Sequence, residues 1–246
     1  MRIIGICPTY RRPTLIPTVL EMWRRQDYPR GDRHLIILDD GGSFDAQNGP
    51  GWSLFSEPER FPTVGAKFAA IADLAIAAGA DALALFEDDD LYFPWHLSAA
   101  ADVLKSADVS APSKVLADDG PVVHESNAKG RHHGAWAFRS EIYRASGGYS
   151  EEANAGFDIR LLRTMKEAGA VVADPVSVAP MSYLYRWASA GYVNGSASGA
   201  NIYAAMEQTH ERSRVPGRIA PALDTGAAAY FDRFVSADGS RLNWPE

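Results

Sequence analysis

Short β-rich runs alternate with helical patterns along the first half of this 246-residue chain. The runs at 2–7 (RIIGIC), 34–38 (HLIIL) and 82–86 (ALALF) are short and apolar, which is typical of buried strands. Between them, residues 14–26 and the alanine-rich segment 64–79 show helical spacing of apolar side chains. This order predicts an α/β fold with a mostly parallel central sheet whose faces are covered by helices.

The second half of the chain continues this pattern less regularly. One helix is expected from Pro94 to about Lys105, and a short second helix is expected just before the Gly147-Gly148 turn. A third helix is expected over 157–169, where Gly169 ends it. Strands are expected at 108–113, near the start of 134–149 and at 170–176. Residues 41–62 are expected to be irregular, and the tail from Met181 shows no clear pattern. The length suits one large domain, and no repeat or linker interrupts it, so we expect a single domain.

Composition excludes several classes of protein. The hydrophobic share of 46% and the charged share of 22% are ordinary for a globular protein and argue against disorder. The net charge of -7 argues against a generally basic, nucleic-acid-binding surface, although a local basic groove would not show in the sum. Cys7 lies in an apolar run and is expected to be a core residue rather than a reactive thiol. No apolar stretch suits a signal peptide or a membrane span, so we expect a cytoplasmic protein without membrane insertion.

Two acidic groups follow predicted strands. Asp39 and Asp40 come after the second strand, and Glu87 to Asp90 form an unbroken run of four acids after the third. Ligands gather at the carboxyl ends of strands in open α/β sheets, so we expect both groups to face one crevice. Neighbouring carboxylates disfavour each other's ionisation unless a cation lies among them, and Mg²⁺ and Mn²⁺ prefer such oxygen ligands. The run therefore favours a metal-bound diphosphate over a solvated acidic turn near a helix start.

Three motifs carry a resemblance to a known family. The segments CPTYRRP at 7–13, HLIILDDGGS at 34–43 and ALALFEDDDLYFP at 82–94 resemble, in order and spacing, motifs of family-2-like glycosyltransferases with the GT-A fold. The resemblance is clear over 3–97 and weaker over 134–186.

That resemblance implies a fold, a donor and a cofactor. The fold would be a single GT-A-like domain over 1–246, with a nucleotide-sugar-binding half at 1–97 and an acceptor-binding half with a C-terminal tail at 98–246. The donor would be a nucleoside-diphosphate sugar, commonly linked to UDP, and the cofactor would be a divalent cation, Mn²⁺ or Mg²⁺. The acceptor is left open among a soluble glycan, a protein, a small molecule and a modified DNA base.

Matching the family motifs residue by residue implies a donor site. Its candidate residues are Pro8, Thr9, Tyr10, Asp39, Asp40, Lys67, Glu87 and Asp88. The first three would border the nucleotide, and Asp39 or Asp40 would accept a hydrogen bond from its base. Lys67 would reach the phosphates or the ribose, or would instead be a surface lysine with a partly buried stem.

The acidic run matches the family's Asp-x-Asp motif in two registers. Counting back from Pro94 matches Glu87 and Asp89, whereas a literal match is Asp88 and Asp90. We take Asp89 as the first metal ligand, with Asp90 beside it. The glutamate at Glu87 is a departure from the aspartate that is usual in the family.

Two family features are not reproduced in the later part of the chain. The Glu-Asp pair that usually carries the general base is missing, and we take Asp158 as the catalytic base, with Glu151 and Glu152 as alternatives. The histidine that often completes the metal shell is also missing, since Trp187 follows Arg186.

A polar segment at 124–134 holds three histidines and two cations. These residues are His124, Lys129, Arg131, His132 and His133. We expect a solvated loop here; a functional alternative is a basic lid near the donor or acceptor.

The resemblance also implies the reaction, an inverting transfer of a sugar to an acceptor hydroxyl in which a carboxylate removes the hydroxyl proton. One alternative is a nucleotidyltransferase, but the segment after the first strand lacks the glycines of a phosphate-binding loop. Another alternative is a nucleotide-sugar-binding module that has lost catalysis.

Overall fold

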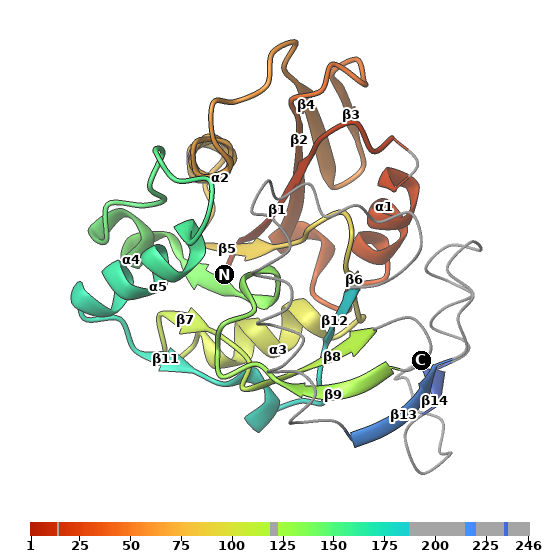
Figure 1. Ribbon diagram of the computed structural model, residues 1–246, viewed down its shortest axis with the longest axis vertical. Helices are drawn as coiled ribbons and strands as arrows, with labels where there is room; N and C mark the ends of the chain where they lie inside the picture. The colour runs from red at the N-terminus through yellow and green to blue at the C-terminus, as the bar shows by residue number, and fades with distance from the viewer. Residues whose placement is uncertain (14, 119–122, 187–214, 220–233, 236–246) are drawn as a thin grey trace.

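The computed structural model describes residues 1–13, 15–118, 123–186, 215–219 and 234–235, and an eight-stranded sheet lies at its centre (Figure 1). In spatial order its strands are β11 (Val172–Ala173), β7 (Val109–Ser110), β10 (Ala137–Arg139), β5 (Ala82–Leu85), β1 (Ile3–Thr9), β2 (Arg33–Asp39), β4 (Trp52–Ser56) and β3 (Gln47–Gly49). The four strands β5, β1, β2 and β4 run parallel, while β10 and β3 are antiparallel to their neighbours. The mostly parallel sheet is therefore confirmed, with β7 and β11 shorter than expected.

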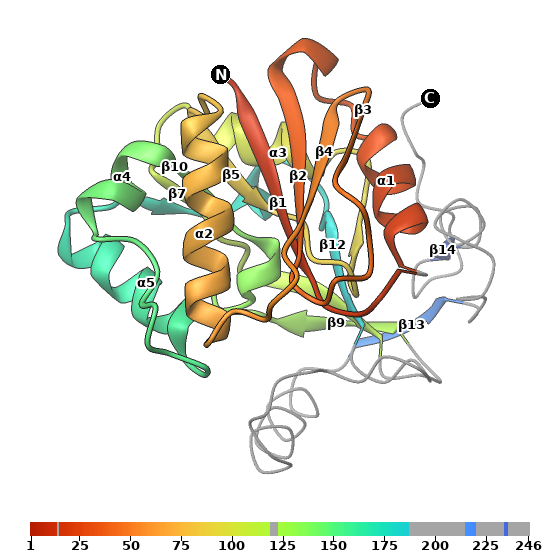
Figure 2. The same ribbon diagram turned by 90° about the horizontal axis from the view of Figure 1, so that it is seen from above.

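Alternate side chains of the central strands point to opposite faces, and both faces are buried. Ile3 and Cys7 of β1 pack in one cluster with apolar side chains of α1 and α3, and Cys7 is the core residue that we expected. Ile4 and Ile6 pack in a second cluster with side chains of α2, α4 and α5. Figure 2 shows α2 and α1 on opposite sides of β1 and β2. Burial on both faces explains why these strands are continuous apolar runs.

Local signals set the ends of the helices. The helices are α1 (Ile16–Arg24), α2 (Val64–Ala77), α3 (His96–Val103), α4 (Ser140–Ala145) and α5 (Phe157–Glu167), with 3-10 helices η1 (Arg30–Asp32), η2 (His133–Ala135) and η3 (Pro175–Ser177). The Thr63 hydroxyl accepts a hydrogen bond from the Ala66 backbone N–H at 2.9 Å, which caps α2. Gly79 and Gly169 follow α2 and α5 with φ of 84° and 93°, as expected for glycine stops. No helix among the described residues is both long and apolar enough to cross a membrane.

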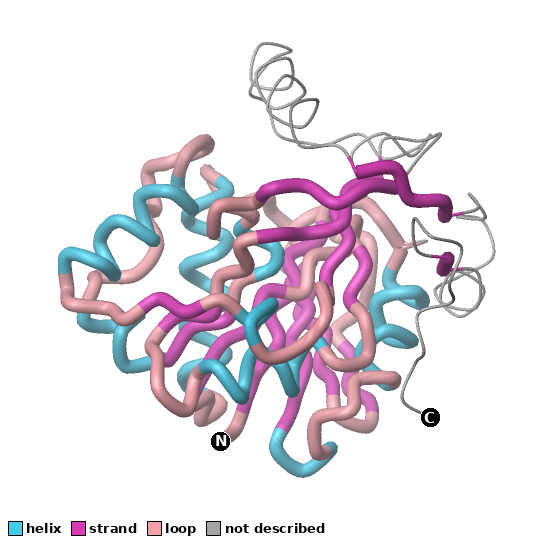
Figure 3. Tube along the Cα trace, turned by 90° about the horizontal axis from the view of Figure 1, so that it is seen from below, coloured by secondary structure: helices cyan, strands magenta, loops and turns pink. Residues whose placement is uncertain are grey.

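A second sheet lies beside the central one (Figures 1 and 3). Its strands, in spatial order, are β14 (Phe234–Val235), β13 (Val215–Ile219), β9 (Val123–Asn127), β8 (Lys114–Asp118), β12 (Tyr183–Arg186) and β6 (Leu91–Tyr92). Strand β6 follows the acidic run directly and pairs with β12, so Tyr92 lies opposite Tyr183. This pairing brings β12, which belongs to the tail from Met181 for which the sequence shows no clear pattern, close to the end of β5.

The expectation of an irregular segment at 41–62 is wrong in part, because β3 and β4 lie within it. Gln47 and Asn48 of β3 are polar and exposed, so this edge strand lacks the apolar pattern by which the buried strands are recognised. The chain turns between the two strands at Gly51, whose φ is 77°. Strand β4 is held by parallel pairing with β2.

Gly65, in the first turn of α2, has no room for a side chain. A Cβ there would lie 2.0 Å from the carbonyl oxygen of Ser150 and 2.9 Å from that of Ala153. We expect Gly65→Ala to lower the free energy of unfolding by about 1–3 kcal/mol, because overpacking outweighs the better helix propensity of alanine. Urea denaturation measures this change.

The control is Gly31→Ala, since a Cβ at Gly31 would meet nothing within 4 Å. This variant should stay within about 0.5 kcal/mol of the parent protein. Equal stability of the two variants would show that α2 and the segment around Ser150 do not pack as described.

Candidate active site

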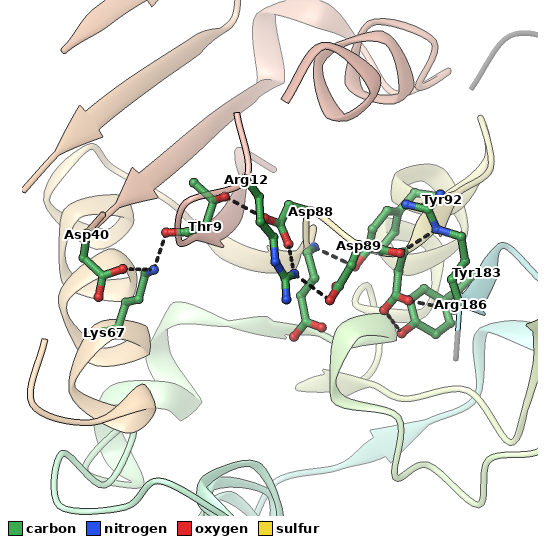
Figure 4. A network of polar contacts seen from close by, with 11 residues as sticks. Thr9, Arg12, Asp40, Lys67, Asp88, Asp89, Tyr92, Tyr183 and Arg186 are labelled. Carbon is green, nitrogen blue, oxygen red and sulfur yellow. Dashed lines mark hydrogen bonds and ion pairs between the residues drawn. The ribbon is translucent and has the colours of Figure 1, made fainter. Parts of the chain in front are cut away.

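The ends of three parallel strands meet at one edge of the central sheet. Strand β1 ends at Thr9, β2 ends at Asp39, and the acidic run follows β5. The Thr9 hydroxyl donates a hydrogen bond to Asp88 at 2.6 Å and so joins the first strand end to the third (Figure 4). The two acidic groups therefore face one edge, as expected from their positions after the strands.

Arg12 is the cation that lies among the acids in this structure. Its guanidinium nitrogen Nη1 lies 2.9 Å from Asp88 Oδ1 and 2.7 Å from Asp89 Oδ2 (Figure 4). Burial and the charge of Asp89 raise the pKa of Asp88 to about 6, and Arg12 opposes this rise. Arg12 was not among the expected site residues. Two signals indicate it: Arg12 belongs to the motif CPTYRRP, and four neighbouring carboxylates require a positive charge beside them.

Asp90 is buried and bound by β12. Its carboxylate accepts hydrogen bonds from the Tyr183 hydroxyl and, at 2.9 Å, from the backbone N–H of Arg186. The Arg186 side chain donates to the carbonyl oxygen of Asp89 at 2.5 Å (Figure 4). The second sheet thus holds the end of the acidic run, and Tyr183 was not among the expected site residues.

Three of the four acids can hold a metal ion. Glu87, Asp89 and Asp90 each offer a carboxylate oxygen, and these oxygens lie within 4.8 Å of one another. Hard oxygen donors of this kind fit Mg²⁺ or Mn²⁺. The pKa of Glu87 is raised to about 8 by burial and by the charges of Asp89 and Asp88, so a bound cation would offset mutual repulsion here. This grouping combines both registers of the motif and leaves out Asp88, which accepts a hydrogen bond from Thr9; Arg12 contacts both Asp88 and Asp89.

Gly134 leaves the space beside these carboxylates open. A Cβ at this position would lie 2.7 Å from the Tyr183 hydroxyl oxygen, 3.1 Å from Glu87 Oε2 and 3.3 Å from Asp90 Oδ2. Any side chain here would crowd two of the three candidate ligands. The donor set and the space therefore both fit a small divalent ion.

The expected solvated loop at 124–134 is wrong for two of its histidines. His124 lies in β9 and is buried, and His133 lies in η2 and is buried against aromatic rings. His133 Nδ1 is 3.2 Å from Glu87 Oε1, and Nε2 is 2.8 Å from the Tyr149 hydroxyl. Burial lowers the pKa of His133 to about 4, so the ring is neutral near pH 7 and contacts a candidate metal ligand.

Asp39 and Asp40 are both buried and both bound by the protein. Asp39 accepts hydrogen bonds from the backbone N–H groups of Gly41 at 3.1 Å and Ser43 at 2.7 Å. Asp40 accepts from the Phe61 N–H at 3.1 Å and pairs with Lys67 at 2.5 Å.

The same ammonium group of Lys67 also donates to the Thr9 carbonyl oxygen (Figure 4). Lys67 is buried, and burial lowers its pKa while the hydrogen bond that it donates to Asp40 raises it. The alternative of a surface lysine is therefore wrong. Lys67 joins α2 to the ends of β1 and β2.

Tyr10 lies between two cations just beyond β1. The guanidinium carbon of Arg60 is 4.4 Å from the centre of its ring, and that of Arg11 is 5.2 Å away. Tyr10 and Pro8 are both partly exposed at this strand end. The expected nucleotide-bordering residues thus lie together, and the two arginines extend the group.

Asp158 lies in the first turn of α5 and is partly buried. The ring of Phe157, the residue before it, lies 5.4 Å from the ring of His133, which contacts Glu87, so the start of α5 lies near the acidic run. Glu151 and Glu152 are exposed. Trp187 lies outside the described residues.

The fold is similar to that of solved structures of two nucleotide-sugar-binding proteins. S. aureus TarS 1–349 in complex with UDP matches with a TM-score of 0.62 and 15% identity, over 76% of this chain and 61% of that one. The same protein in complex with UDP-GlcNAc matches with a TM-score of 0.60 and 16% identity, over 78% of this chain and 62% of that one.

The second protein with a similar fold is the mannosyltransferase PcManGT from Pyrobaculum calidifontis, solved in complex with GDP-Man and Mn²⁺. It matches with a TM-score of 0.55 and 18% identity, over 79% of this chain and 58% of that one. This chain therefore spans about three fifths of the length of these solved chains, and 37% of the chain in another structure of S. aureus TarS. No protein-family model and no curated protein matches the sequence. At this identity the likeness concerns the fold, and the chain has a GT-A-like glycosyltransferase fold.

Replacing Gly134 by alanine should weaken binding of Mn²⁺ about tenfold or more, because the new methyl group would displace Glu87 or Asp90 and second-layer changes at metal sites cost about 10–100-fold. Isothermal titration with MnCl₂ measures the affinity. Gly31→Ala serves as the control and should bind Mn²⁺ like the parent protein. Unchanged affinity in Gly134→Ala would place the ion elsewhere.

Proposed function

We propose that the protein is a metal-dependent glycosyltransferase that moves a sugar from a nucleoside-diphosphate sugar to an acceptor hydroxyl. The observation that carries the proposal is the meeting of Glu87, Asp89 and Asp90 with the ends of β1 and β2 at one edge of a GT-A-like sheet. The similar structures hold UDP, UDP-GlcNAc, or GDP-Man with Mn²⁺, which supports a donor of this class. A UDP-linked donor is proposed first, because the TarS complexes have the higher TM-scores.

The nucleotide would lie against the ends of β1 and β2. Pro8, Thr9 and Tyr10 would border it, and the Tyr10 ring offers a flat face for the base at the end of β1. Asp39 or Asp40 would accept a hydrogen bond from the base. Both carboxylates are held by fixed N–H donors, and each oxygen has a second lone pair with which it can accept another bond.

The diphosphate would lie at the end of β5. Glu87, Asp89 and Asp90 would hold Mn²⁺ or Mg²⁺, which when bound would stabilise the negative charge of the departing diphosphate. Arg12 adds a positive charge beside the same carboxylates. Asp88 binds Thr9 and Arg12, and through these contacts it would hold the acidic run in place beside the proposed nucleotide site at the end of β1. Lys67 would position Asp40 and Thr9 for the nucleotide, because its ammonium group donates hydrogen bonds to both.

Asp158 would be the general base. Its carboxylate would accept the acceptor's hydroxyl proton while the oxygen bonds to the anomeric carbon and the bond from that carbon to the diphosphate breaks. Attack from the side opposite the leaving group would invert the anomeric centre. The proposal for Asp158 is supported by the position of the start of α5, where the Phe157 ring packs against His133 beside Glu87.

A nucleotide-sugar-binding module without catalysis is the second candidate. The observation that favours it is that Phe157, not an acid, precedes Asp158, so the second acid of the family's pair is missing. Metal-dependent hydrolysis of a sugar nucleotide in the absence of any acceptor distinguishes the two, because a module would not turn over.

Asp89→Asn should reduce Mn²⁺-dependent hydrolysis of UDP-GlcNAc or GDP-mannose by about 100-fold or more, since a metal ion supplies several kcal/mol of charge stabilisation. It should also abolish the rise in melting temperature that Mn²⁺ with UDP gives the parent protein. The matched control is Asp102→Asn, an exposed acid of α3 paired with Lys105, which should behave like the parent. An undiminished rate would remove Asp89 from the mechanism.

Asp158→Asn should lower the rate of transfer by about 10²–10⁴-fold, the usual contribution of a general base. The melting-temperature rise with Mn²⁺ and UDP should be unchanged, because Asp158 is not among the proposed donor or metal ligands. Asp102→Asn, which changes an exposed acid of α3, is again the control and should retain full activity. If Asp158→Asn is as active as this control, the base is another residue.

A further inference from the structure

A cavity of about 610 Å³ lies away from the strand ends that form the candidate active site. It is lined by residues of α1, by Arg30 of η1, by Arg33 at the start of β2, by the turn between β3 and β4, and by Trp52 at the start of β4. Strand β2 runs from Arg33 to Asp39, so the cavity and the active site lie near opposite ends of one strand, about 20 Å apart. The volume is in the range of pockets that hold small molecules.

Trp23 and Trp52 both line the cavity, but Trp23 is buried and packs edge-on against Phe86, so Trp52 offers the exposed aromatic face. The Trp23 indole N–H donates to the Gly51 carbonyl oxygen at 3.0 Å, which ties α1 to the turn between β3 and β4. Trp52 lies so close over Gly49 that a Cβ there would meet its ring at 2.3 Å. Trp52 is only partly buried, so part of its ring faces the cavity.

Positive charge in this cavity is not balanced by the carboxylates around it. Arg33 is buried and donates to the carbonyl oxygens of Gln26 and Arg24, and no carboxylate of the described residues lies within salt-bridge distance of it. Burial and the charge of Arg30 lower the pKa of Arg33, and the charge of Asp27 opposes this shift. Arg30 itself is exposed and has no ion pair or hydrogen bond from its side chain among the described residues.

The one acid of the lining, Glu21, is already engaged. It accepts hydrogen bonds from Arg24 at 2.8 and 2.9 Å and from Arg25 at 2.7 Å. These bonds, that from Arg24 first, lower its pKa to about 2, so the carboxylate is ionised and satisfied. Arg30 is therefore the exposed cation of the lining that has no acidic partner among the described residues, while Arg33 is already engaged by backbone carbonyls.

We propose that this cavity is a second ligand site, which binds an anionic saccharide. Flat indole faces pack against the C–H face of a sugar ring, and guanidinium groups form paired hydrogen bonds with a carboxylate or a phosphate. The chain as a whole carries a net charge of -7, so this cationic wall is a local exception that selects an anion. The site is independent of the proposed transfer reaction and of its metal.

Tetragalacturonic acid is a suitable probe, with neutral cellotetraose as its matched comparison. By isothermal titration and tryptophan fluorescence, the full chain should bind the acidic tetrasaccharide at least tenfold more tightly than the neutral one. Arg30→Gln should weaken this binding at least fivefold. Arg163→Gln removes the same charge from an exposed position on α5 and should leave the affinity unchanged.

Asp89→Asn should also leave this affinity unchanged, although it abolishes the effect of Mn²⁺ with UDP. Failure of the proposed function would therefore not be mistaken for failure of this site. Absence of binding, equal binding of the neutral tetrasaccharide, or equal loss in Arg30→Gln and Arg163→Gln would overturn the proposal. Loss of binding in Asp89→Asn would move the ligand to the active site and would overturn it as well.

Discussion

Positive charge beside buried carboxylates is the condition on which this edge of the sheet depends. Asp88 and Asp90 are almost fully buried at the end of β5, where unpaired negative charge is costly. Arg12 supplies a cation to the first, while Tyr183 and a backbone N–H supply hydrogen bonds to the second. Lys67 likewise forms an ion pair with the buried carboxylate of Asp40. The same arrangement keeps carboxylate oxygens of Glu87, Asp89 and Asp90 within 4.8 Å of one another, a grouping that suits a divalent ion.

The central sheet and the position of the site could be predicted from the sequence, because each depends on a local signal. Continuous apolar runs such as 34–38 mark strands buried on both faces, and parallel strands bring their carboxyl ends to one edge. The acids that follow β2 and β5 therefore had to lie close together. Glycine stops at Gly79 and Gly169 likewise depend only on backbone conformation.

The partners of these acids could not be predicted in the same way, because they depend on contacts between distant parts of the chain. Arg12 stands beside Arg11 in the sequence, and only tertiary packing shows which of the two reaches the acids. His133 lies in a polar segment, yet it is buried between aromatic rings and contacts Glu87. Strand β3 was missed because an exposed, polar edge strand has no apolar periodicity.

The pairing of β6 with β12 has a consequence for the order of assembly. Tyr183 donates a hydrogen bond to Asp90 and lies 93 positions after it in the sequence. Strand β12 also supplies the backbone N–H from which Asp90 accepts a second hydrogen bond. A nascent chain that has emerged from the ribosome only as far as α5 already holds the strands β1, β2 and β5, but not the strand that closes the acidic run. Folding of the N-terminal half can thus precede synthesis of this last part, whereas a competent site requires it.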